Sequence, residues 1–355
     1  MVAILPPTLV SGIIEPLQIS ALESLQSIEI NQNNIKLTEA EERLVRIFTI
    51  RCGGVMSSVT SLGGGLSGVR VIKLLVTDRY GAKIHNAVAK LGTPEDIRDE
   101  AYRVQMYVSR LNESSTPRQL DKIEFGAGKN AGVFYSLADP YESTAYASAL
   151  KGGEMATLTV RGIASAISNW NRQIPQRPVS VTEIRQRTLS DEKFFELVEK
   201  YELQWILPIE QATVQVCWGC THGDLHGFNA LVAEDGRSVV IDYGDVAEGP
   251  VSFDPVTLEL SLLFHPGMNE TVNSEWPSLT QAEKWGNVEL FLDGCPVPDF
   301  IRECRDWALD IGAGQREISA SAYSYLMRQL KYPDTDKERI LALLKGVKNN
   351  YDNTM

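Results

Sequence analysis

The stretch of sequence that decides the fold of this chain runs from residue 221 to residue 229 and reads Thr221-His222-Gly223-Asp224-Leu225-His226-Gly227-Phe228-Asn229. It is polar, and it puts a carboxylate, Asp224, and an amide, Asn229, five residues apart. Such a segment in front of an apolar run predicts a loop. The loop is therefore the first place to look for reactive side chains.

A second carboxylate follows a short distance along the chain. After the loop come an apolar pair at 231–232, a turn at 234–236 and an apolar run at 239–241 that ends in Asp242, with Asp245 three residues later. A buried strand that ends in aspartate places a carboxylate at the edge of a sheet. The loop and the end of the strand together supply two carboxylates and an amide.

This set of groups suits phosphoryl transfer. One carboxylate can orient and deprotonate an attacking hydroxyl, while an amide oxygen and another carboxylate hold Mg²⁺ against the phosphates. The alternative is that these Asp and Asn residues only form solvated turns. The joint pattern, H-G-D-x-H-x-x-N followed by I-D-x-x-D, favours the first interpretation.

A glycine-rich segment lies far upstream and fits the spacing G-x-G-x-x-G. Its residues are Gly63, Gly64, Gly65, Ser67 and Gly68. A dinucleotide-binding loop of this spacing must run from a strand into a helix, whereas this segment runs from one β-rich stretch into another. That context is typical of the glycine flap that covers ATP phosphates in kinases, with a plain hairpin as the alternative. Arg70 stands where the kinase pattern has valine.

The order of predicted elements divides the chain into lobes. Strands are expected at 55–62, 69–76, 84–91 and 133–137, and a helix is expected from Pro94, with Thr93 as its N-cap. After a break at 138–140 the chain is predicted to be mainly helical, with two short strands near residues 230 and 240. Residues 1–50 are interpreted as an N-terminal extension with a helix around 38–50, residues 51–139 as a β-rich N-lobe, and residues 140–355 as a helical C-lobe.

The two motifs resemble those of a known family. Residues 222–229 and 241–245 are similar to the catalytic and metal-binding motifs of the aminoglycoside phosphotransferase and choline kinase family, and the resemblance covers roughly residues 55–330. It implies an α+β class, with a bilobal protein-kinase-like fold that has a small β-rich N-lobe and a larger, mainly helical C-lobe. The sequence departs from protein kinases in having no H-R-D, D-F-G or A-P-E.

The resemblance also implies roles for single residues. Asp224 would be the catalytic base, Asn229 and Asp242 would be the Mg²⁺ ligands, and Asp254 would brace the catalytic loop. The other supporting residues implied are His222, His226 and Asp245. For His226, contact with phosphate or substrate and a hydrogen bond that braces the loop both stay open.

In this family a lysine on the third strand pairs with a glutamate of the next helix. Lys90 and Glu100 fit best, and Lys90 would contact the ATP phosphates. Lys73 and Lys83 are the alternatives to Lys90. The ordinary role of a lysine on a strand is only that of a solvated side chain.

Two further regions are assigned by their order in the chain. The strand at 133–137 would contact adenine through its backbone at Tyr135 and Leu137. The predicted amphipathic helices near the C-terminus have charged residues close by that are either solvated or facing the substrate. These charged residues are Arg316, Glu317, Arg328 and Lys331.

Composition sets limits on the function. The chain has 355 residues and a net charge of −12, which disfavours nucleic acid as a partner. No apolar run approaches the roughly 18 residues that a membrane span needs. The first basic residue, Lys36, comes too late for a secretory signal, and the five cysteines favour reduced thiols in the cytoplasm. Cys217 and Cys220, a C-x-x-C, are interpreted as structural thiols.

The sequence thus predicts a Mg²⁺- and ATP-dependent phosphotransferase that acts on a hydroxyl of a small molecule, of the amino sugar or amino alcohol class. One alternative is a nucleotide-binding regulatory module or pseudokinase. Another is a protein or peptide kinase of the same fold. The N-terminal extension is a candidate surface for a protein partner.

Overall fold

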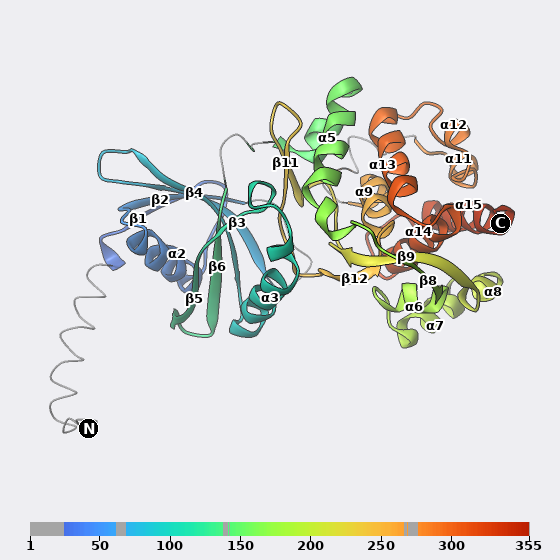
Figure 1. Cartoon of the computed structure of the whole chain (residues 1–355). Coiled ribbons are helices and arrows are strands. Elements are labelled where there is room, and N and C mark those ends of the chain that lie inside the picture. Colours follow the sequence, from blue (N-terminus) through green and yellow to red (C-terminus); the bar gives the residue numbers. More distant parts are fainter. Residues whose placement is uncertain are drawn as a thin grey trace. The chain divides into compact units, whose positions relative to one another are not determined.

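The computed structural model describes residues 25–61, 69–137, 141, 143–265, 268 and 276–354. They divide into two compact units (Figure 1). Unit 1 comprises the described residues within Met1–Tyr102 and Pro117–Asp139, and unit 2 those within Arg103–Thr116 and Pro140–Met355. Unit 1 is rich in strands and unit 2 is larger and mainly helical, so the expected α+β class is confirmed.

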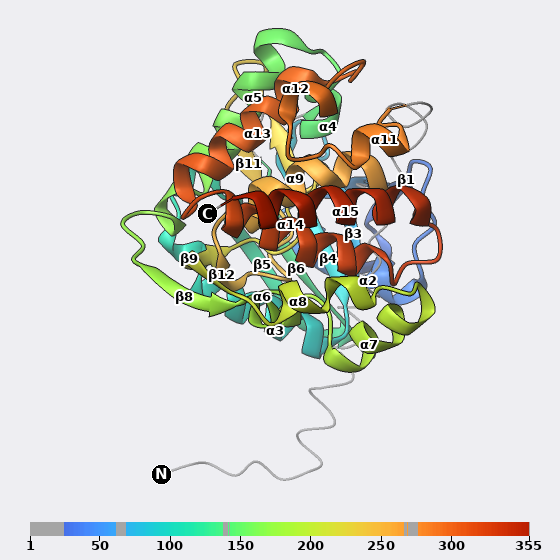
Figure 2. The same cartoon turned by 90° about the vertical axis from the view of Figure 1, so that its right-hand side faces the viewer.

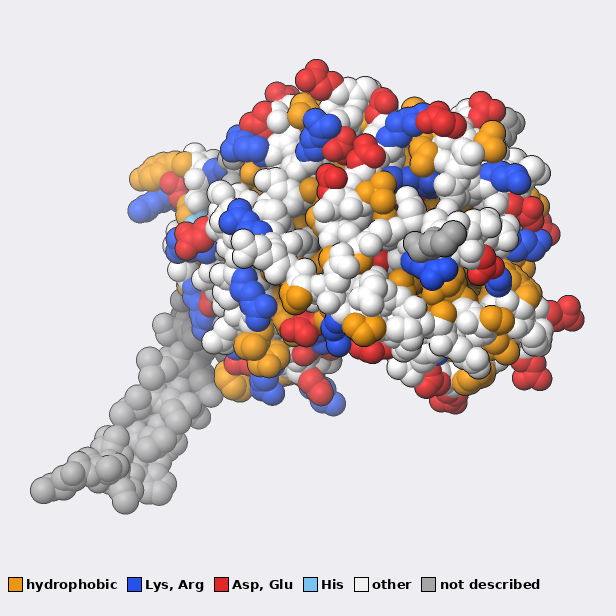
Figure 3. Space-filling view, turned by 45° about the vertical axis from the view of Figure 1, so that its right-hand side comes forward, with side chains coloured by type: hydrophobic (Ala, Val, Ile, Leu, Met, Phe, Trp, Pro, Cys, Tyr) orange, Lys and Arg blue, Asp and Glu red, His pale blue; other side chains and the backbone are white. Residues whose placement is uncertain are grey.

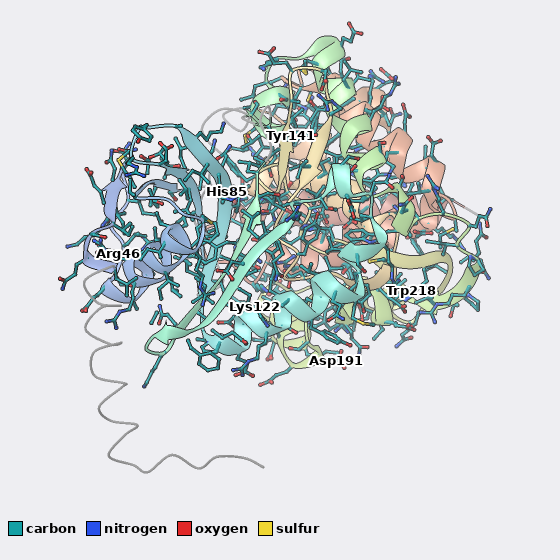
Figure 4. The ribbon with its side chains drawn as sticks, turned by 60° about the vertical axis from the view of Figure 1, so that its left-hand side comes forward. Arg46, His85, Lys122, Tyr141, Asp191 and Trp218 are labelled. Atoms are coloured by element: carbon teal, nitrogen blue, oxygen red, sulfur yellow. The ribbon has the colours of Figure 1, made fainter. Side chains whose placement is uncertain are left out.

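Unit 1 is built on one six-stranded sheet in the order β1-β2-β3-β4-β6-β5. The strands are β1 (Glu29–Gln32), β2 (Met56–Ser61), β3 (Arg70–Thr77), β4 (Lys83–Gly92), β5 (Gln119–Ala127) and β6 (Asn130–Ser136). β1 pairs parallel to β2, and all other neighbouring strands are antiparallel. Figure 4 labels His85 on β4 and Lys122 on β5. The four expected strands are present, and the glycine-rich segment between β2 and β3 lies outside the described residues.

Helix α2 (Glu39–Arg51) belongs to the core of unit 1. It begins after Thr38, whose side chain accepts the N–H of Glu41 while the Glu41 carboxylate accepts the N–H of Thr38, as a capping box predicts. Phe48 is fully buried and stacks on Phe134 of the sheet with ring centroids 4.1 Å apart. The division expected after residue 50 therefore differs from the observed one, because the apolar face of α2 is covered by the sheet.

Helix α3 (Pro94–Met106) follows β4 directly. It starts at Pro94 as expected, and Thr93 Oγ1 accepts the N–H of Asp96 at 3.2 Å. Its buried side chains are those of Ile97 and Glu100, so the helix turns one apolar and one charged residue inward.

Unit 2 contains the remaining helices and two small sheets. Its helices include α4 (Ala145–Ala149), α5 (Gly153–Ala166), α6 (Val181–Gln186), α7 (Asp191–Lys200), α8 (Leu207–Glu210), α9 (Phe253–Phe264), α11 (Leu279–Ala282), α12 (Val288–Phe291), α13 (Pro298–Ile311), α14 (Gln315–Gln329) and α15 (Lys337–Asn353). Its strands are β7 (Ser143–Thr144), β8 (Gln176–Ser180), β9 (Thr213–Thr221), β10 (Ala230–Val232), β11 (Ser238–Val240) and β12 (Ala247–Pro250).

The two short strands expected near residues 230 and 240 are β10 and β11, which pair antiparallel. The expectation that the rest of this region is helical is wrong, because β8, β9 and β12 form a second sheet in the order β12-β9-β8. Val214 and Val216 of β9 are buried and alternate with exposed Thr213 and Gln215. That period of two was available in the sequence and points to a strand.

The core of unit 2 surrounds α9, which is buried along its whole length. Helices α13 and α14 pack against α9, and α14 and α15 lie side by side (Figure 2). Acidic and basic side chains are interspersed over the face shown in Figure 3. Among the helices of the described residues, none combines the length and the apolar character that crossing a membrane requires.

Candidate active site

Unit 1 contains the predicted lysine–glutamate pair. Lys90 on β4 donates from Nζ to Glu100 Oε2 on α3 at 2.7 Å, and the two side chains are only 8% and 4% exposed. Tyr135 on β6 donates its hydroxyl to the other oxygen, Glu100 Oε1, at 3.5 Å. Of the two alternatives, Lys83 is exposed and Lys73 is half-buried on β3. The structure thus singles out Lys90 as the lysine buried with a carboxylate.

The strand expected to contact adenine is β6 and the residue that follows it. The backbone N–H of Leu137 donates to the carbonyl of Asn86 on β4 at 2.7 Å. Tyr135 is in register with Val88 on one side and Gln119 on the other. The predicted backbone contact with adenine can therefore use the carbonyl of Leu137 but not its N–H.

In unit 2, Asp254 near the start of α9 binds the backbone of the loop at 222–229. The Asp254 carboxylate accepts the backbone N–H groups of His222 at 2.8 Å and of Gly223 at 3.1 Å. Burial raises the pKa of Asp254, although His222 and the two backbone donors favour its charged form. This is the bracing contact that the resemblance implied for Asp254.

Asp242 follows Ile241, whose backbone N–H and carbonyl groups are both hydrogen-bonded. Ile241 donates its N–H to the carbonyl of Asn229 at 2.9 Å and accepts a hydrogen bond from His222 Nε2 at 3.0 Å. Because a carbonyl can only accept, Nε2 carries the proton of this imidazole. Asp242 itself has φ of +68°, a left-handed conformation that costs an ordinary residue about 1 to 2 kcal/mol. Backbone strain of this kind clusters at functional sites.

Asn229 is the residue that connects the loop to the sheet. Its side-chain Nδ2 donates to the carbonyl of Asp224 at 2.9 Å, and β10 begins at the next residue. The orientation of the amide turns its oxygen, rather than its nitrogen, toward other partners. An amide oxygen and a carboxylate are the hard oxygen donors that suit Mg²⁺, so Asn229 and Asp242 fit that ion by donor type.

Mg²⁺ in kinases commonly takes only one or two protein carboxylates and completes its shell with phosphate oxygens and water. In the part of the chain that the structure describes, no group of three or more His, Cys, Asp or Glu side chains is arranged to hold a metal ion.

Asp224 has a different neighbour at each of its two carboxylate oxygens. Arg328 of α14 donates from Nη1 to Asp224 Oδ1 at 3.1 Å, and His226 Nε2 lies 3.8 Å from Asp224 Oδ2. The second guanidinium nitrogen, Nη2, lies 3.9 Å from Asp245 Oδ2. The Asp224 side chain remains 34% exposed, so the carboxylate is held but still open to solvent.

Gly223 allows the loop to pass close to Asp245. Its φ of +81° is left-handed, and a Cβ built there would lie 2.5 Å from the backbone oxygen of Asp245. A side chain at this position would therefore push apart the two segments that carry Asp224 and Asp245.

Three rings gather on the Oδ2 side of Asp224. His265, at the C-terminal end of α9, lies 4.6 Å from His226 and 4.7 Å from Phe228 between ring centroids. Burial lowers the pKa of His226, although Asp224 and Asp242 oppose the shift. Burial, aided by His226, lowers the pKa of His265 to about 4. Both imidazoles are therefore neutral near pH 7.

Two arginines enter this site that the motifs did not assign to it. Arg328 had been noted only as one of several charged residues, solvated or facing the substrate. Arg187, after α6, donates from Nη2 to Thr221 Oγ1 at 2.9 Å, and burial lowers its pKa. It occupies the space beside Gly249, where a Cβ would lie 1.9 Å from Arg187 Nη1. Gly249, in the strand β12 that pairs with β9, was the signal in the sequence that a large side chain packs there.

Cys217 and Cys220 both lie in β9, three residues apart, and so point to opposite faces of the strand. Trp218 between them is labelled in Figure 4. All five cysteines of the chain are described, and each is free. Burial raises the pKa of Cys220 to about 12, which agrees with a structural thiol. Glu317 of α14 accepts the N–H of Cys217 at 2.9 Å, so this carboxylate braces β9.

The predicted residues fall into three sets. In unit 2, hydrogen bonds, ion pairs through Arg328 and, for Asp242, an electrostatic interaction with His226 connect one cluster of residues, which are Asp224, Asn229, Asp242, Asp245, Asp254, His222 and His226. In unit 1, Lys90, Glu100 and Tyr135 are in contact, and Leu137 lies two residues further on. The remaining residues lie outside the described part of the chain, and they are Gly63, Gly64, Gly65, Ser67 and Gly68.

Comparison with known proteins gives matches to solved structures. No family model matches the sequence, and no curated protein matches it. The chain is similar to the apo form of a thermostable mutant of aminoglycoside phosphotransferase APH(4)-Ia, with 14% identity, a TM-score of 0.46, and coverage of 86% of this chain and 94% of that one.

Two further solved structures are similar. Choline kinase LicA from Streptococcus pneumoniae matches with 12% identity and a TM-score of 0.39, over 84% of this chain and 94% of that one. The GDP complex of wild-type aminoglycoside 2'-phosphotransferase-IIIa matches with 14% identity and a TM-score of 0.42, over 84% and 93%. These three proteins are two aminoglycoside phosphotransferases and a choline kinase.

Proposed function

We propose that this protein is a Mg²⁺-dependent phosphotransferase that moves the γ-phosphoryl group of ATP to a hydroxyl of a small molecule. The observation that carries the proposal is the loop that holds Asp224. Its backbone is fixed by Asp254 on one side and by Asn229 on the other, while the Asp224 carboxylate stays open to solvent. A fixed, accessible carboxylate is what a base acting on a hydroxyl requires.

The proposed reaction starts at the Asp224 carboxylate. It accepts the proton of the acceptor hydroxyl as the hydroxyl oxygen bonds to the γ-phosphorus. The bond between the γ-phosphorus and the oxygen that bridges it to the β-phosphate breaks, and ADP leaves. The products are the phosphorylated acceptor and ADP, with the hydroxyl proton on Asp224 until it passes to solvent.

Asn229 and Asp242 would hold Mg²⁺ in this reaction. When bound, the ion neutralises charge on the phosphate oxygens. Lys90 would contact the α- and β-phosphates. Glu100 would keep the ammonium group of Lys90 charged and would fix its orientation. The glycine-rich segment would cover the phosphates with its backbone N–H groups.

For the acceptor, we propose an amino sugar or an amino alcohol. The support is charge: the chain carries −12, and four aspartates of the site stand against two arginines, which leaves it negative before Mg²⁺ binds. The four aspartates are Asp224, Asp242, Asp245 and Asp254. An acceptor with an ammonium group is attracted to such a site.

The test is transfer of labelled phosphate from ATP to a panel of amino sugars, amino alcohols and peptides, with Asp224→Asn beside the unmodified protein. We expect a labelled small molecule and a loss of about 10²- to 10⁴-fold in Asp224→Asn, the contribution typical of a general base. Asp235→Asn, at the exposed turn before β11, is the control and should keep full activity. Equal turnover by Asp224→Asn would refute the proposed function, and label on peptides alone would make the protein a peptide kinase.

A further inference from the structure

Arg328 lies near the C-terminal end of α14, 104 residues after Asp224 in the sequence, and its guanidinium reaches the catalytic loop. Nη1 is 3.1 Å from Asp224 Oδ1 and 3.4 Å from the carbonyl oxygen of Gly223. One nitrogen thus contacts both the side chain of the proposed base and the backbone just before it. Charge-assisted hydrogen bonds of this kind fix geometry more firmly than neutral ones.

The guanidinium is itself held in place. The Arg328 side chain is 14% exposed, against 34% for Asp224. Burial works to lower the pKa of Arg328, but Asp224, Tyr332 and Asp245 outweigh it and hold that pKa above its ordinary value. Arg328 is therefore a permanent cation on a helix that packs against α9 and α15.

This contact makes the two carboxylate oxygens of Asp224 unequal. Oδ1 accepts the hydrogen bond from Arg328, whereas Oδ2 lies 3.8 Å from His226 Nε2, beyond hydrogen-bonding distance. Of the two oxygens, Oδ2 is the one with a lone pair to offer to a hydroxyl.

We propose that Arg328 is a positioning residue for Asp224: it fixes the carboxylate so that Oδ2 receives the proton of the acceptor hydroxyl. This inference rests on the proposed function, because it assigns a task to Arg328 only if Asp224 is the base. Without Arg328 the carboxylate is free to rotate about its χ angles, and the fraction of molecules with Oδ2 correctly aimed falls. Misplacement of a reacting group by about 1 Å can cost about 10²-fold in rate.

The first experiment measures kcat and the KM for MgATP in Arg328→Met and Arg328→Lys, with the acceptor found in the panel or with ATP hydrolysis. Met keeps the unbranched stem of the side chain and removes the charged guanidinium, and Lys keeps a charge. We expect kcat to fall about 10- to 100-fold in Arg328→Met with KM for MgATP changed less than about twofold, and part of kcat to return in Arg328→Lys. Arg328→Met with the kcat of the unmodified protein overturns the inference.

Arg316→Met is the matched control, because Arg316 is on the same helix but donates to the carbonyl of Thr354 and stacks on Tyr351. It should leave kcat unchanged. Equal losses in Arg316→Met and Arg328→Met would mean that α14 is merely disturbed, and would overturn the inference. Binding of MgATP, followed by calorimetry, shows that each variant is folded; if Arg328→Met fails to bind, Arg328→Gln takes its place.

The second experiment is a double-mutant cycle with Asp224→Asn. If Arg328 acts through Asp224, then adding Arg328→Met to Asp224→Asn lowers the residual turnover by less than about twofold. Additive losses overturn the inference and leave the proposed function standing. Unchanged turnover in Asp224→Asn refutes the proposed function itself, so the two failures are told apart.

Discussion

The two units of the molecule each contain an ion pair at a predicted functional residue. The two pairs differ in the sequence separation of their partners and in their exposure to solvent. Lys90 and Glu100 in unit 1 are ten residues apart in sequence, 2.7 Å apart in space, and 8% and 4% exposed. Arg328 and Asp224 in unit 2 are 104 residues apart in sequence, 3.1 Å apart, and 14% and 34% exposed. The side chains of Lys90 and Glu100 are therefore buried, whereas the Asp224 carboxylate is partly exposed to solvent.

The difference in burial fixes what each pair can do. A buried pair cannot lose one partner without leaving an uncompensated charge in a medium of low dielectric constant, so it behaves as a permanent unit. A carboxylate with a third of its surface exposed can be solvated by water and can take part in proton transfer. Unit 1 therefore offers a fixed cation, while unit 2 offers a carboxylate that is held in place and open to solvent.

The largest expected effect is on stability, in Glu100→Ala. The substitution removes the carboxylate that lies 2.7 Å from Lys90 Nζ, and loss of one member of a buried ion pair should lower the free energy of unfolding by about 3 to 5 kcal/mol. Arg328→Met leaves a carboxylate that water can reach, and should cost only about 1 to 2 kcal/mol. Urea unfolding curves of both variants measure the difference. Equal losses would mean that the contrast in burial has no energetic consequence.

The second effect is on turnover, in Lys90→Met. Removal of the cation that is proposed to contact the phosphates should lower kcat/KM for MgATP by about 10²-fold, as loss of one charge-stabilising group typically does. Lys83→Met, on the same strand but exposed, is the control and should behave as the unmodified protein. If Lys83→Met loses as much as Lys90→Met, unit 1 does not bind phosphates through its buried pair.

The smallest effect concerns His265, which lies beside the open pair. Its pKa of about 4 in the folded protein is below the ordinary value of 6.5, so from pH 6.5 down to about 4 the unfolded chain binds a proton that the folded chain does not. The free energy of unfolding should fall over this range, and His265→Gln should remove about 1 to 2 kcal/mol of that fall, allowing for partial exposure. Urea unfolding at pH 7 and pH 4.5 tests it; identical pH dependence in both proteins would contradict the burial of this imidazole.

Local patterns accounted for much of the fold. Thr93 and Pro94 marked the start of α3, β-rich runs of residues located β2, β3 and β4, and the loop at 222–229 lies between two strands. Each of these signals is carried by neighbours within a few residues. The lysine–glutamate pair was implied by the resemblance to a known family, with Lys73 and Lys83 as alternatives to Lys90, and the structure puts Lys90 and Glu100 in contact.

Other features could not be predicted from the sequence, because they depend on which residues pack against a side chain. Helix α2 was expected, but only Phe48 stacked on Phe134 shows that it completes the core of unit 1. The role of Glu317 was open until its carboxylate was found on the backbone of Cys217. The sheet of β8, β9 and β12 was missed although β9 alternates, since the surrounding helices dominated the interpretation of that region.

The sequence by itself determined which residues form the loop with Asp224 and Asn229 and the short strand that comes just before Asp242, and its resemblance to a known family indicated the pair of Lys90 and Glu100. The spacing of these residues is local, and local spacing is set by the geometry of helices, strands and turns. Only the tertiary structure decided that Arg328 meets Asp224. That contact closes a chain segment of 104 residues, and the packing of α14 against α9, rather than any motif, brings its two ends together.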